Sequence, residues 1–282
     1  MKQNKKVLVV CKYPKNSKES KVCKIAEKEG FEFEYHWKNN LKPKDLTDID
    51  IVISIGGDGT ALSAGHFLID KPLLAVNSDS EKSEGALTTI NIKDLNKKLD
   101  EIRNNEYQTE LLERIEVYIN NKLQTPIALN EVFIANEKAY LVSKYKIKTI
   151  KENSGNHITN DPEFSNGQFG KTNDAINRIV HKNGSSVEEE HKSSGLIFST
   201  GTGSTAWFKS AGGGPFCPQE KYIKMIVREP YFGRLGKFNI VNETIDEKEE
   251  IEITAETKMI LAIDSIREFN LKKGDKVRIK IS

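Results

Sequence analysis

The segment Ile49–Ile55, with the sequence Ile-Asp-Ile-Val-Ile-Ser-Ile, limits the fold of this chain more than any other feature. A short β-branched run of this kind predicts a strand buried inside a sheet. Directly after it come Gly56-Gly57-Asp58-Gly59 and then a helical pattern from Thr60 to Ile69. A strand, a glycine-rich turn and a helix in this order predict one unit of an α/β domain.

The same alternation of strands and helices extends over the N-terminal part of the chain. A helix is predicted after Ser17, and a second one over Ile92–Ile102, where apolar residues repeat at spacings of three and four. Further strands are predicted at Val7–Cys11, Phe31–Trp37 and Leu73–Asn77. We therefore expect residues 1–105 to form a doubly wound α/β domain with a mainly parallel sheet.

Residues 106–282 show a different pattern, with short strands at close intervals and few helices. Ile115–Ile119 alternates between apolar and polar residues, and Asn120-Asn121 predicts a hairpin turn. This texture predicts an antiparallel β-sandwich, interrupted by a mobile, polar insertion at residues 151–192 that holds one short helix around Ile176–Val180. The other predicted strands are Ile127–Ala135, Tyr140–Ile150, Leu196–Ser199, Met225–Val227, Phe238–Val241, Ile251–Thr254, Met259–Ile263 and Val277–Ile281.

The charge and hydropathy of the chain exclude some classes of partner. Lys and Arg number 43 against 41 Asp and Glu, so a nucleic acid, which requires a clustered basic face, is not expected. No apolar run reaches the ~18 residues that span a bilayer, and the N-terminus lacks the apolar core of a secretory signal. We expect a cytoplasmic protein with neither a membrane nor a nucleic-acid partner.

The turn Gly56–Gly59 is the strongest candidate for a functional site. In open α/β sheets, ligands bind beyond the carboxyl ends of the strands, and glycines let the backbone approach them closely. The backbone N–H groups of the turn and the helix start can hold phosphate oxygens. Asp58, surrounded by glycines, can accept a proton from a hydroxyl group as the base of a phosphoryl transfer. The alternative is a tight turn of purely structural meaning.

A second candidate is the loop Ser199–Thr205, which is rich in glycine and hydroxyl residues and follows a predicted strand. Such a loop suits a nucleotide, because its hydroxyls can bind ribose and phosphate. The alternative is a flexible turn. Trp207, just beyond the loop, can stack on a base or lie in the core.

A third candidate is Asn130-Glu131, a polar pair that interrupts a hydrophobic strand pattern. A carboxylate in such a place must find a partner, because burying it unpaired is costly. The hydroxyls of a ligand or the backbone amides of a bulge would each serve.

Together and in this order, the three motifs resemble those of the NAD kinase family. The family's Gly-Gly-Asp-Gly matches Gly56–Gly59, its Asn-Glu pair matches Asn130-Glu131, and its Gly/Thr-rich loop matches Thr200–Thr205. The segments Asn77–Gly85 and Ser193–Ser204 look like the branch typified by animal mitochondrial NAD kinases. The ordered set of motifs is specific, whereas Gly-Gly-Asp-Gly alone also occurs in lipid kinases and phosphofructokinases.

The resemblance implies an α/β domain and a β-sandwich with an active site between them, where ATP phosphorylates the adenosine ribose of NAD. Asp58 would remove the proton from the 2′-hydroxyl, and Mg²⁺ would bridge the donor phosphates. It also implies a homo-oligomer, either a dimer or a tetramer. The implied substrate-binding residues are Gly57, Gly59, Thr60, Asn77, Asn130, Glu131, Thr200, Thr202, Ser204, Thr205, Ala206, Trp207 and Asp264.

Two other functions are compatible with the same turn. A lipid kinase of the diacylglycerol or sphingosine kinase type would require a wide apolar groove for acyl chains. A non-catalytic dinucleotide sensor would keep the binding loops and dispense with the base, but Asp58 is present.

Overall fold

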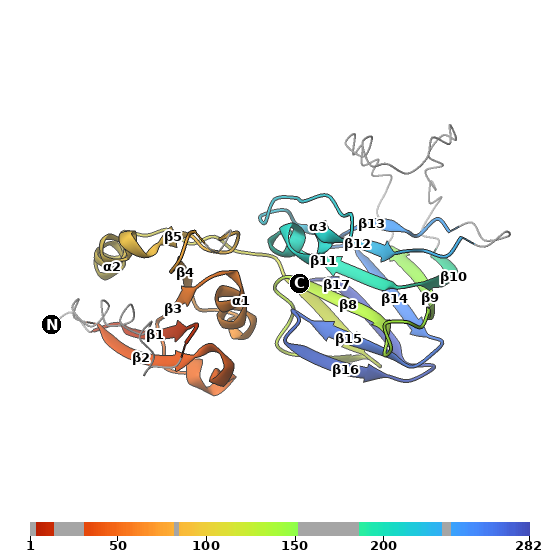
Figure 1. Ribbon diagram of the computed structural model, residues 1–282, viewed down its shortest axis with the longest axis horizontal. Helices are drawn as coiled ribbons and strands as arrows, with labels where there is room; N and C mark the ends of the chain where they lie inside the picture. Colours follow the sequence, from red (N-terminus) through yellow and green to blue (C-terminus); the bar gives the residue numbers. More distant parts are fainter. Residues whose placement is uncertain (1–3, 14–30, 82–84, 152–185, 233–237) are drawn as a thin grey trace.

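The computed structural model describes residues 4–13, 31–81, 85–151, 186–232 and 238–282. Figure 1 shows an α/β unit at the N-terminal end of the molecule and a β-sandwich beside it, with α1 on the side facing the sandwich. The helices expected after Ser17 and around Ile176–Val180 fall outside the described residues.

The N-terminal unit contains a parallel sheet with the strand order β2-β1-β3-β4-β5. Among the described residues of this unit, two α-helices and three short 3₁₀ segments accompany the sheet, which confirms the predicted α/β fold. The strands are β1 (Lys6–Cys11), β2 (Glu32–Trp37), β3 (Ile51–Gly56), β4 (Leu73–Asn77) and β5 (Ile90–Asn91). The helices are η2 (Lys38–Asn40), η3 (Pro43–Leu46), α1 (Asp58–Phe67), η4 (Ile92–Asp94) and α2 (Leu95–Asn104).

The central strands are apolar along their whole length because helices cover both faces of the sheet. In β1, Val7 and Val9 pack in the same cluster as Leu99 of α2. Leu8 and Val10, which point to the other face, pack in a cluster with residues of α1. Continuous apolar runs of this kind are typical of parallel sheets buried on both sides.

The second unit is a sandwich of two six-stranded antiparallel sheets, as predicted. A 3₁₀ segment and one short helix, η5 (Thr202–Thr205) and α3 (Trp207–Ser210), follow β11. The first sheet comprises β10 (Val187–Ser193), β9 (Ser143–Lys151), β14 (Glu249–Ala255), β17 (Lys276–Ile281), β6 (Ile115–Ile119) and β7 (Lys122–Leu123). The second comprises β13 (Asn242–Asp246), β12 (Tyr222–Arg228), β11 (Gly195–Ser199), β8 (Glu131–Asn136), β15 (Met259–Ile263) and β16 (Arg267–Leu271).

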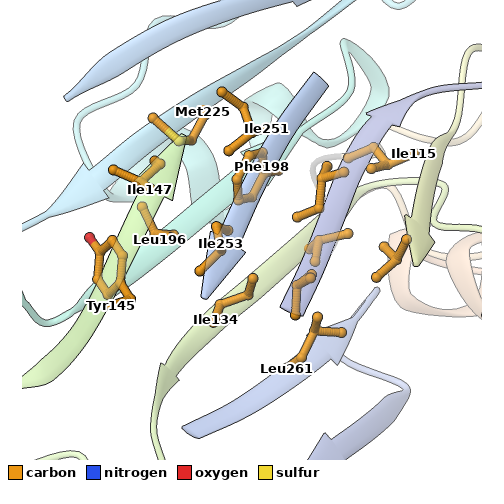
Figure 2. Close-up of a cluster of buried hydrophobic side chains, with 14 of the residues drawn as sticks. Ile115, Ile134, Tyr145, Ile147, Leu196, Phe198, Met225, Ile251, Ile253 and Leu261 are labelled. Atoms are coloured by element: carbon orange, nitrogen blue, oxygen red, sulfur yellow. The ribbon is translucent and has the colours of Figure 1, made fainter. Parts of the chain in front are cut away.

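The core of the sandwich lies between the two sheets (Figure 2). Ile251 and Ile253 of the first sheet share one buried cluster with Leu196, Phe198 and other residues of the second. Every second residue of these strands points inward, so alternation along the sequence places the apolar side chains in one layer.

The structure differs from the sequence-based expectation in several places, among them β16 (Arg267–Leu271), for which no strand was predicted. Residues 187–192, expected within a mobile insertion, belong to the edge strand β10, which pairs with β9. The polar residues of this strand hid its pattern in the sequence. In the structure, one of them, Glu190, forms an ion pair with Lys146 of the neighbouring strand β9. The strand expected at Phe238–Val241 lies instead at Asn242–Asp246, where four of five residues are polar.

No helix in the described part of the chain combines the length and apolar composition needed to cross a bilayer.

Phe198→Ala is expected to lower the free energy of unfolding by about 3–5 kcal/mol, because Phe198 is fully buried between the sheets and its loss leaves a cavity. Urea unfolding followed by circular dichroism measures this loss. The control is Leu111→Ala, since Leu111 is 91% exposed and its truncation should change stability by less than about 0.5 kcal/mol. Equal effects of the two substitutions would contradict the described core.

Candidate active site between the two units

Asp58 lies where β3 of the parallel sheet passes into α1. The strand ends at Gly56, Gly57 is the N-cap residue, and Asp58 is the first residue of the helix. The first helical hydrogen bonds run from the N–H groups of Thr60 and Ala61 to the Gly57 carbonyl. The N–H groups of Asp58 and Gly59 precede those bonds, as is usual at a helix start, and such groups are suited to bind an anion.

The Asp58 carboxylate faces a cavity of about 440 Å³ whose walls come from both units of the chain. The backbone N–H of Leu87 donates a 2.8 Å hydrogen bond to Asp58 Oδ1, which holds the side chain at the cavity wall. The lining residues are Asp58, Gly59, Leu62, Ala86, Leu87, Asn130, Glu131, Thr202, Thr205, Ala206, Trp207 and Ser265.

Eight of these residues were predicted from the sequence, and four were not. Leu62 lies one turn beyond Asp58 in α1, so its position follows from the helix period. Ala86 and Leu87 follow the Asn77–Gly85 segment, and Ser265 follows Asp264, but none of these three types of side chain marks a ligand site in a sequence.

Two buried polar atoms on the sandwich side of the cavity lack a protein partner. Asn130 Oδ1 and Thr202 Oγ1 make no hydrogen bond within the described structure, although both residues are at least nine-tenths buried. Buried polar groups are nearly always hydrogen-bonded, because an unpaired one costs about 1–3 kcal/mol. Both residues line the cavity, and because the two atoms themselves are covered, a ligand with hydroxyl or amide groups can supply the missing partners once the side chains turn toward it.

The hydroxyl-rich loop is held tightly against the strand that carries Asn130. Thr200 donates its hydroxyl to the Leu129 carbonyl at 2.6 Å, and its N–H bonds the Asn130 carbonyl at 3.0 Å. A Cβ at Gly203 would lie 2.3 Å from the Asn130 carbonyl oxygen, so only glycine permits this approach. The loop and the Asn-Glu pair therefore form one rigid wall.

Several residues expected to bind the ligand lie behind the cavity wall. Ser204 uses its hydroxyl within the loop, donating to the Gly201 carbonyl at 2.7 Å and accepting from the Phe216 N–H at 3.0 Å. The Thr60 side chain is buried against Gly56. Three further residues that were expected to bind the ligand do not line the cavity: Gly57, Asn77 and Thr200.

Asn77 is positioned by the register of the sheet, which pairs it with Gly56 at the carboxyl ends of β3 and β4. Its Oδ1 accepts a 3.0 Å bond from the Asp79 N–H, so it shapes the loop beside the glycine turn.

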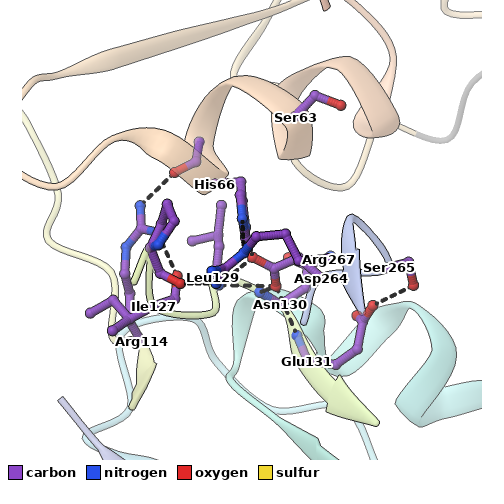
Figure 3. A network of polar contacts seen from close by, with 12 residues as sticks. Ser63, His66, Arg114, Ile127, Leu129, Asn130, Glu131, Asp264, Ser265 and Arg267 are labelled. Atoms are coloured by element: carbon purple, nitrogen blue, oxygen red, sulfur yellow. Dashed lines mark hydrogen bonds and ion pairs between the residues drawn. The ribbon is translucent and has the colours of Figure 1, made fainter. Parts of the chain in front are cut away.

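Asp264 lies behind the cavity wall. Its side chain is fully buried, it is absent from the cavity lining, and its carboxylate accepts bonds from the N–H groups of Leu129, Asn130 and Glu131 at 2.7–3.2 Å. His66 of α1 contacts Asp264 Oδ2 at 2.7 Å (Figure 3). Asp264 thus binds the backbone beneath the Asn-Glu pair.

Glu131 is a carboxylate with an unusual environment. Burial raises its pKa to about 7, and the nearby charge of Asp264 adds to the rise, whereas a hydrogen bond from the Ser265 hydroxyl opposes it. Glu131 is therefore close to half ionised at neutral pH, in contact with the cavity.

Trp207 combines the two roles considered for it. Its ring packs against Phe133 with 4.4 Å between the centroids, and it also lines the cavity. The guanidinium of Arg228 lies over both rings. This packing fixes the indole at the cavity wall.

The side chains of the described residues hold no cluster of three or more His, Cys, Asp or Glu that would form a complete metal site. Asp58, Glu131 and Asn130 nevertheless offer hard oxygen atoms to the cavity, which are the ligands that Mg²⁺ takes alongside phosphate and water.

Two family models match the chain. The ATP-NAD kinase N-terminal domain matches residues 2–107, and the ATP-NAD kinase C-terminal domain matches residues 100–282. The NAD kinase of Aquifex aeolicus is 30% identical over 256 residues, which cover 86% of this chain and 75% of that protein.

Solved structures share the fold. An NAD kinase from Archaeoglobus fulgidus in complex with ATP has a TM-score of 0.66 at 20% identity and covers 98% of this chain and 90% of that one. The yeast NADH kinase complexed with NADH has a TM-score of 0.73 at 16% identity and covers 99% and 80% of the two chains. At these identities the likeness shows the fold alone.

Two glutamates, the buried Glu131 and the partly buried Glu243, should make the stability of this protein fall as the pH rises. Burial raises the pKa values of Glu131 and Glu243 from 4.5 to about 7, so between these values the native state binds protons that the unfolded state has lost. The free energy of unfolding therefore declines through this window, by at most about 3 kcal/mol for each group.

Urea unfolding at intervals from pH 4.5 to pH 8 measures this slope. Glu131→Gln and Glu243→Gln should each make it shallower, because glutamine does not titrate. An unchanged slope in both variants would contradict the burial of the two carboxylates.

Proposed function

Because the chain belongs to the ATP-NAD kinase family, we propose that it is an ATP-dependent NAD kinase whose reaction takes place in the cavity beside Asp58. The reaction transfers the γ-phosphoryl group of ATP to the 2′-hydroxyl of the adenosine ribose of NAD and gives NADP and ADP. The observation that supports this site most directly is the Asp58 carboxylate at a cavity wall that also holds the unpartnered atoms of Asn130 and Thr202.

Asp58 acts as the base in this proposal. Leu87 N–H occupies Oδ1, which leaves Oδ2 to accept the proton of the ribose 2′-hydroxyl. The ribose oxygen then forms a bond to the γ-phosphorus while the bond between that phosphorus and the β–γ bridging oxygen breaks, and the electrons of the broken bond leave with ADP. A positioned base contributes roughly 10²–10⁴ to the rate of such a step.

The start of α1 is the proposed site for the phosphates of ATP. The N–H groups of Asp58 and Gly59 point out of the helix end, where the helix dipole favours negative charge. Lys38 adds a cation there, since its Nζ lies 3.9 Å from the position that a Cβ at Gly59 would take. Lys38 is therefore near enough to the helix start to contact an anion bound there.

Asn130, Glu131 and Thr202 are the proposed partners of the dinucleotide. Asn130 Oδ1 and Thr202 Oγ1 accept from ribose hydroxyls, and ionised Glu131 does the same. The flat, fixed ring of Trp207 is available to stack on a base of NAD.

Mg²⁺ fits this arrangement as an ion bound chiefly by ATP. Asp58 and Glu131 are the protein carboxylates that would hold it together with phosphate oxygens and water. Once bound, it neutralises the charge of the donor phosphates.

The two other functions have less support. A lipid kinase needs a long apolar groove, but the sandwich wall of this cavity presents Asn130, Glu131, Thr202 and Thr205. A dinucleotide sensor has no need of a base, yet Asp58 stands at the cavity wall.

Three finer expectations remain proposals. The chain acts in the cytoplasm; it falls near the branch of the animal mitochondrial NAD kinases, an assignment that rests on Asn77–Gly85 and Ser193–Ser204. It also forms a homo-oligomer through the sandwich, which is supported by the adjacent exposed side chains of Tyr140, Leu141 and Val142.

Asp58→Asn should lower kcat for NADP formation by about 10²–10⁴, because asparagine cannot accept the hydroxyl proton. The purified protein is incubated with ATP, Mg²⁺ and NAD, and NADP is assayed enzymatically. The control is Asp94→Asn, which alters an exposed carboxylate near the start of α2 and should leave kcat unchanged. Activity of Asp58→Asn within about tenfold of the parent would exclude Asp58 as the base.

Glu131→Gln should abolish a pH dependence of kcat/KM for NAD near neutrality. With a pKa of about 7, the ionised fraction of Glu131 rises about tenfold between pH 6 and pH 8, and kcat/KM of the parent should rise with it. Glu243→Gln is the matched control, since burial raises the pKa of Glu243 to about the same value away from the cavity. If kcat/KM of Glu131→Gln still rises with pH, a group other than Glu131 controls the pH dependence.

A further inference from the structure

We propose that His66 and Asp264 are positioning residues, which set the place of Asn130 and Glu131 relative to Asp58 across the cavity. The catalytic part of this inference rests on the proposed NAD kinase reaction, whereas the structural part does not. The two residues are separated by 198 positions in the sequence and belong to different units of the molecule (Figure 3).

The carboxylate of Asp264 holds the backbone of the Asn-Glu pair. Leu129, Asn130 and Glu131 all direct their N–H groups at it, with the shortest bond, 2.7 Å, from Asn130 to Oδ1. Three successive backbone donors on one carboxylate fix the peptide planes, and these planes set the directions in which the Asn130 and Glu131 side chains leave the chain.

His66 connects this carboxylate to the helix that carries Asp58. Arg267 donates its Nε–H to His66 Nε2 at 3.0 Å, so Nε2 must be the acceptor. The proton of the ring is therefore on Nδ1, which donates to Asp264 Oδ2 at 2.7 Å. His66 is thus a neutral bridge with one tautomer, and each of its ring nitrogens has a defined partner.

The contacts around His66 fix the same end of α1. Arg114 donates to the Gly65 carbonyl at 2.7 Å, and a Cβ at Gly65 would lie 2.6 Å from Leu129 Cδ2. Asp58 is at the other end of this helix of ten residues, which is a rigid rod about 15 Å long. Fixing the end at Gly65 and His66 therefore fixes the position of Asp58.

The backbone at Asp264 is strained, and the strain brings its neighbour into the cavity. Asp264 and Ser265 both have a φ of 54°, a left-handed conformation that costs non-glycine residues of order 1 kcal/mol or more each. This turn buries Asp264 beneath the Asn-Glu pair while Ser265 lines the cavity and donates to Glu131 Oε1 at 3.2 Å. The hydrogen bonds of Asp264 hold the turn in this conformation.

Loss of the bridge should reduce kcat more than it weakens substrate binding, because small errors in the alignment of reacting atoms have large effects on rate. His66→Leu should lower kcat at saturating ATP and NAD by about 10- to 100-fold, with KM for NAD within about threefold of the parent. His66→Asn retains a side-chain donor near the position of Nδ1. Its kcat should recover at least half of the decrease seen in His66→Leu, measured on a logarithmic scale.

His191→Leu is the matched control. His191 is also buried and also bonds a carboxylate, Glu189 Oε2 at 2.9 Å, but it lies within the sandwich. Its loss should lower the urea midpoint and leave kcat within about twofold of the parent. Should His66→Leu fail to fold, Arg267→Gln, in a partly exposed position, tests the same bridge and should give a smaller decrease in kcat.

A second readout does not depend on activity. The protein has two tryptophans, Trp37 at the end of β2 in the parallel sheet and Trp207 in α3 beside the sandwich. The single substitution Trp207→Phe therefore leaves a fluorescent probe only in the first unit, and the single substitution Trp37→Phe leaves one only in the second. With His66 present, the two probes should report the same urea midpoint; with His66→Leu, the midpoints should separate.

Coincident midpoints together with a kcat within threefold of the parent in His66→Leu would overturn the inference. If the parent makes no NADP, the proposed function fails, and the separation of the midpoints alone then decides whether His66 joins the two units.

Discussion

The buried carboxylate of Asp264 is the interaction on which the active-site geometry depends. Moving an ion of this kind out of water costs several kcal/mol, and the cost must be offset by well-placed donors. Three backbone N–H groups and the His66 ring provide them, and they come from both units of the chain. The charge can therefore be buried only when the sandwich and α1 are correctly placed. The same placement sets the geometry of the cavity, so the burial of Asp264 and the shape of the cavity depend on each other.

The two carboxylates at the cavity wall have different surroundings, which suits them to different roles. Asp58 is partly exposed at a helix start with one backbone donor, whereas Glu131 is buried next to the charge of Asp264 and has a pKa of about 7. Environments that differ in this way allow two groups of the same chemical type to act separately, one as a base and the other as a ligand for hydroxyls.

Local features of the sequence were sufficient to predict the fold and the three motifs, because a buried strand, a glycine turn and a polar pair in an apolar run each have a short-range signature. Asp58, Asn130 and Thr202, one from each motif, line the same cavity. Within the hydroxyl-rich loop the sequence could not separate Thr202, which faces the cavity, from Thr200 and Ser204, which bond the backbone. All three have similar side chains, and only the path of the loop decides which of them points inward.

The bridge of His66, Asp264 and Arg267 could not be predicted, since its members are ordinary residues separated by up to 201 positions and come together only through the packing of α1 on the sandwich. Its importance follows from the nature of phosphoryl transfer. Such a reaction needs little covalent participation by the protein, and its rate depends on alignment and electrostatics. A protein that divides its site between two units must therefore devote buried polar groups to holding those units in register, and in this chain those groups lie directly beneath the residues that contact the cavity.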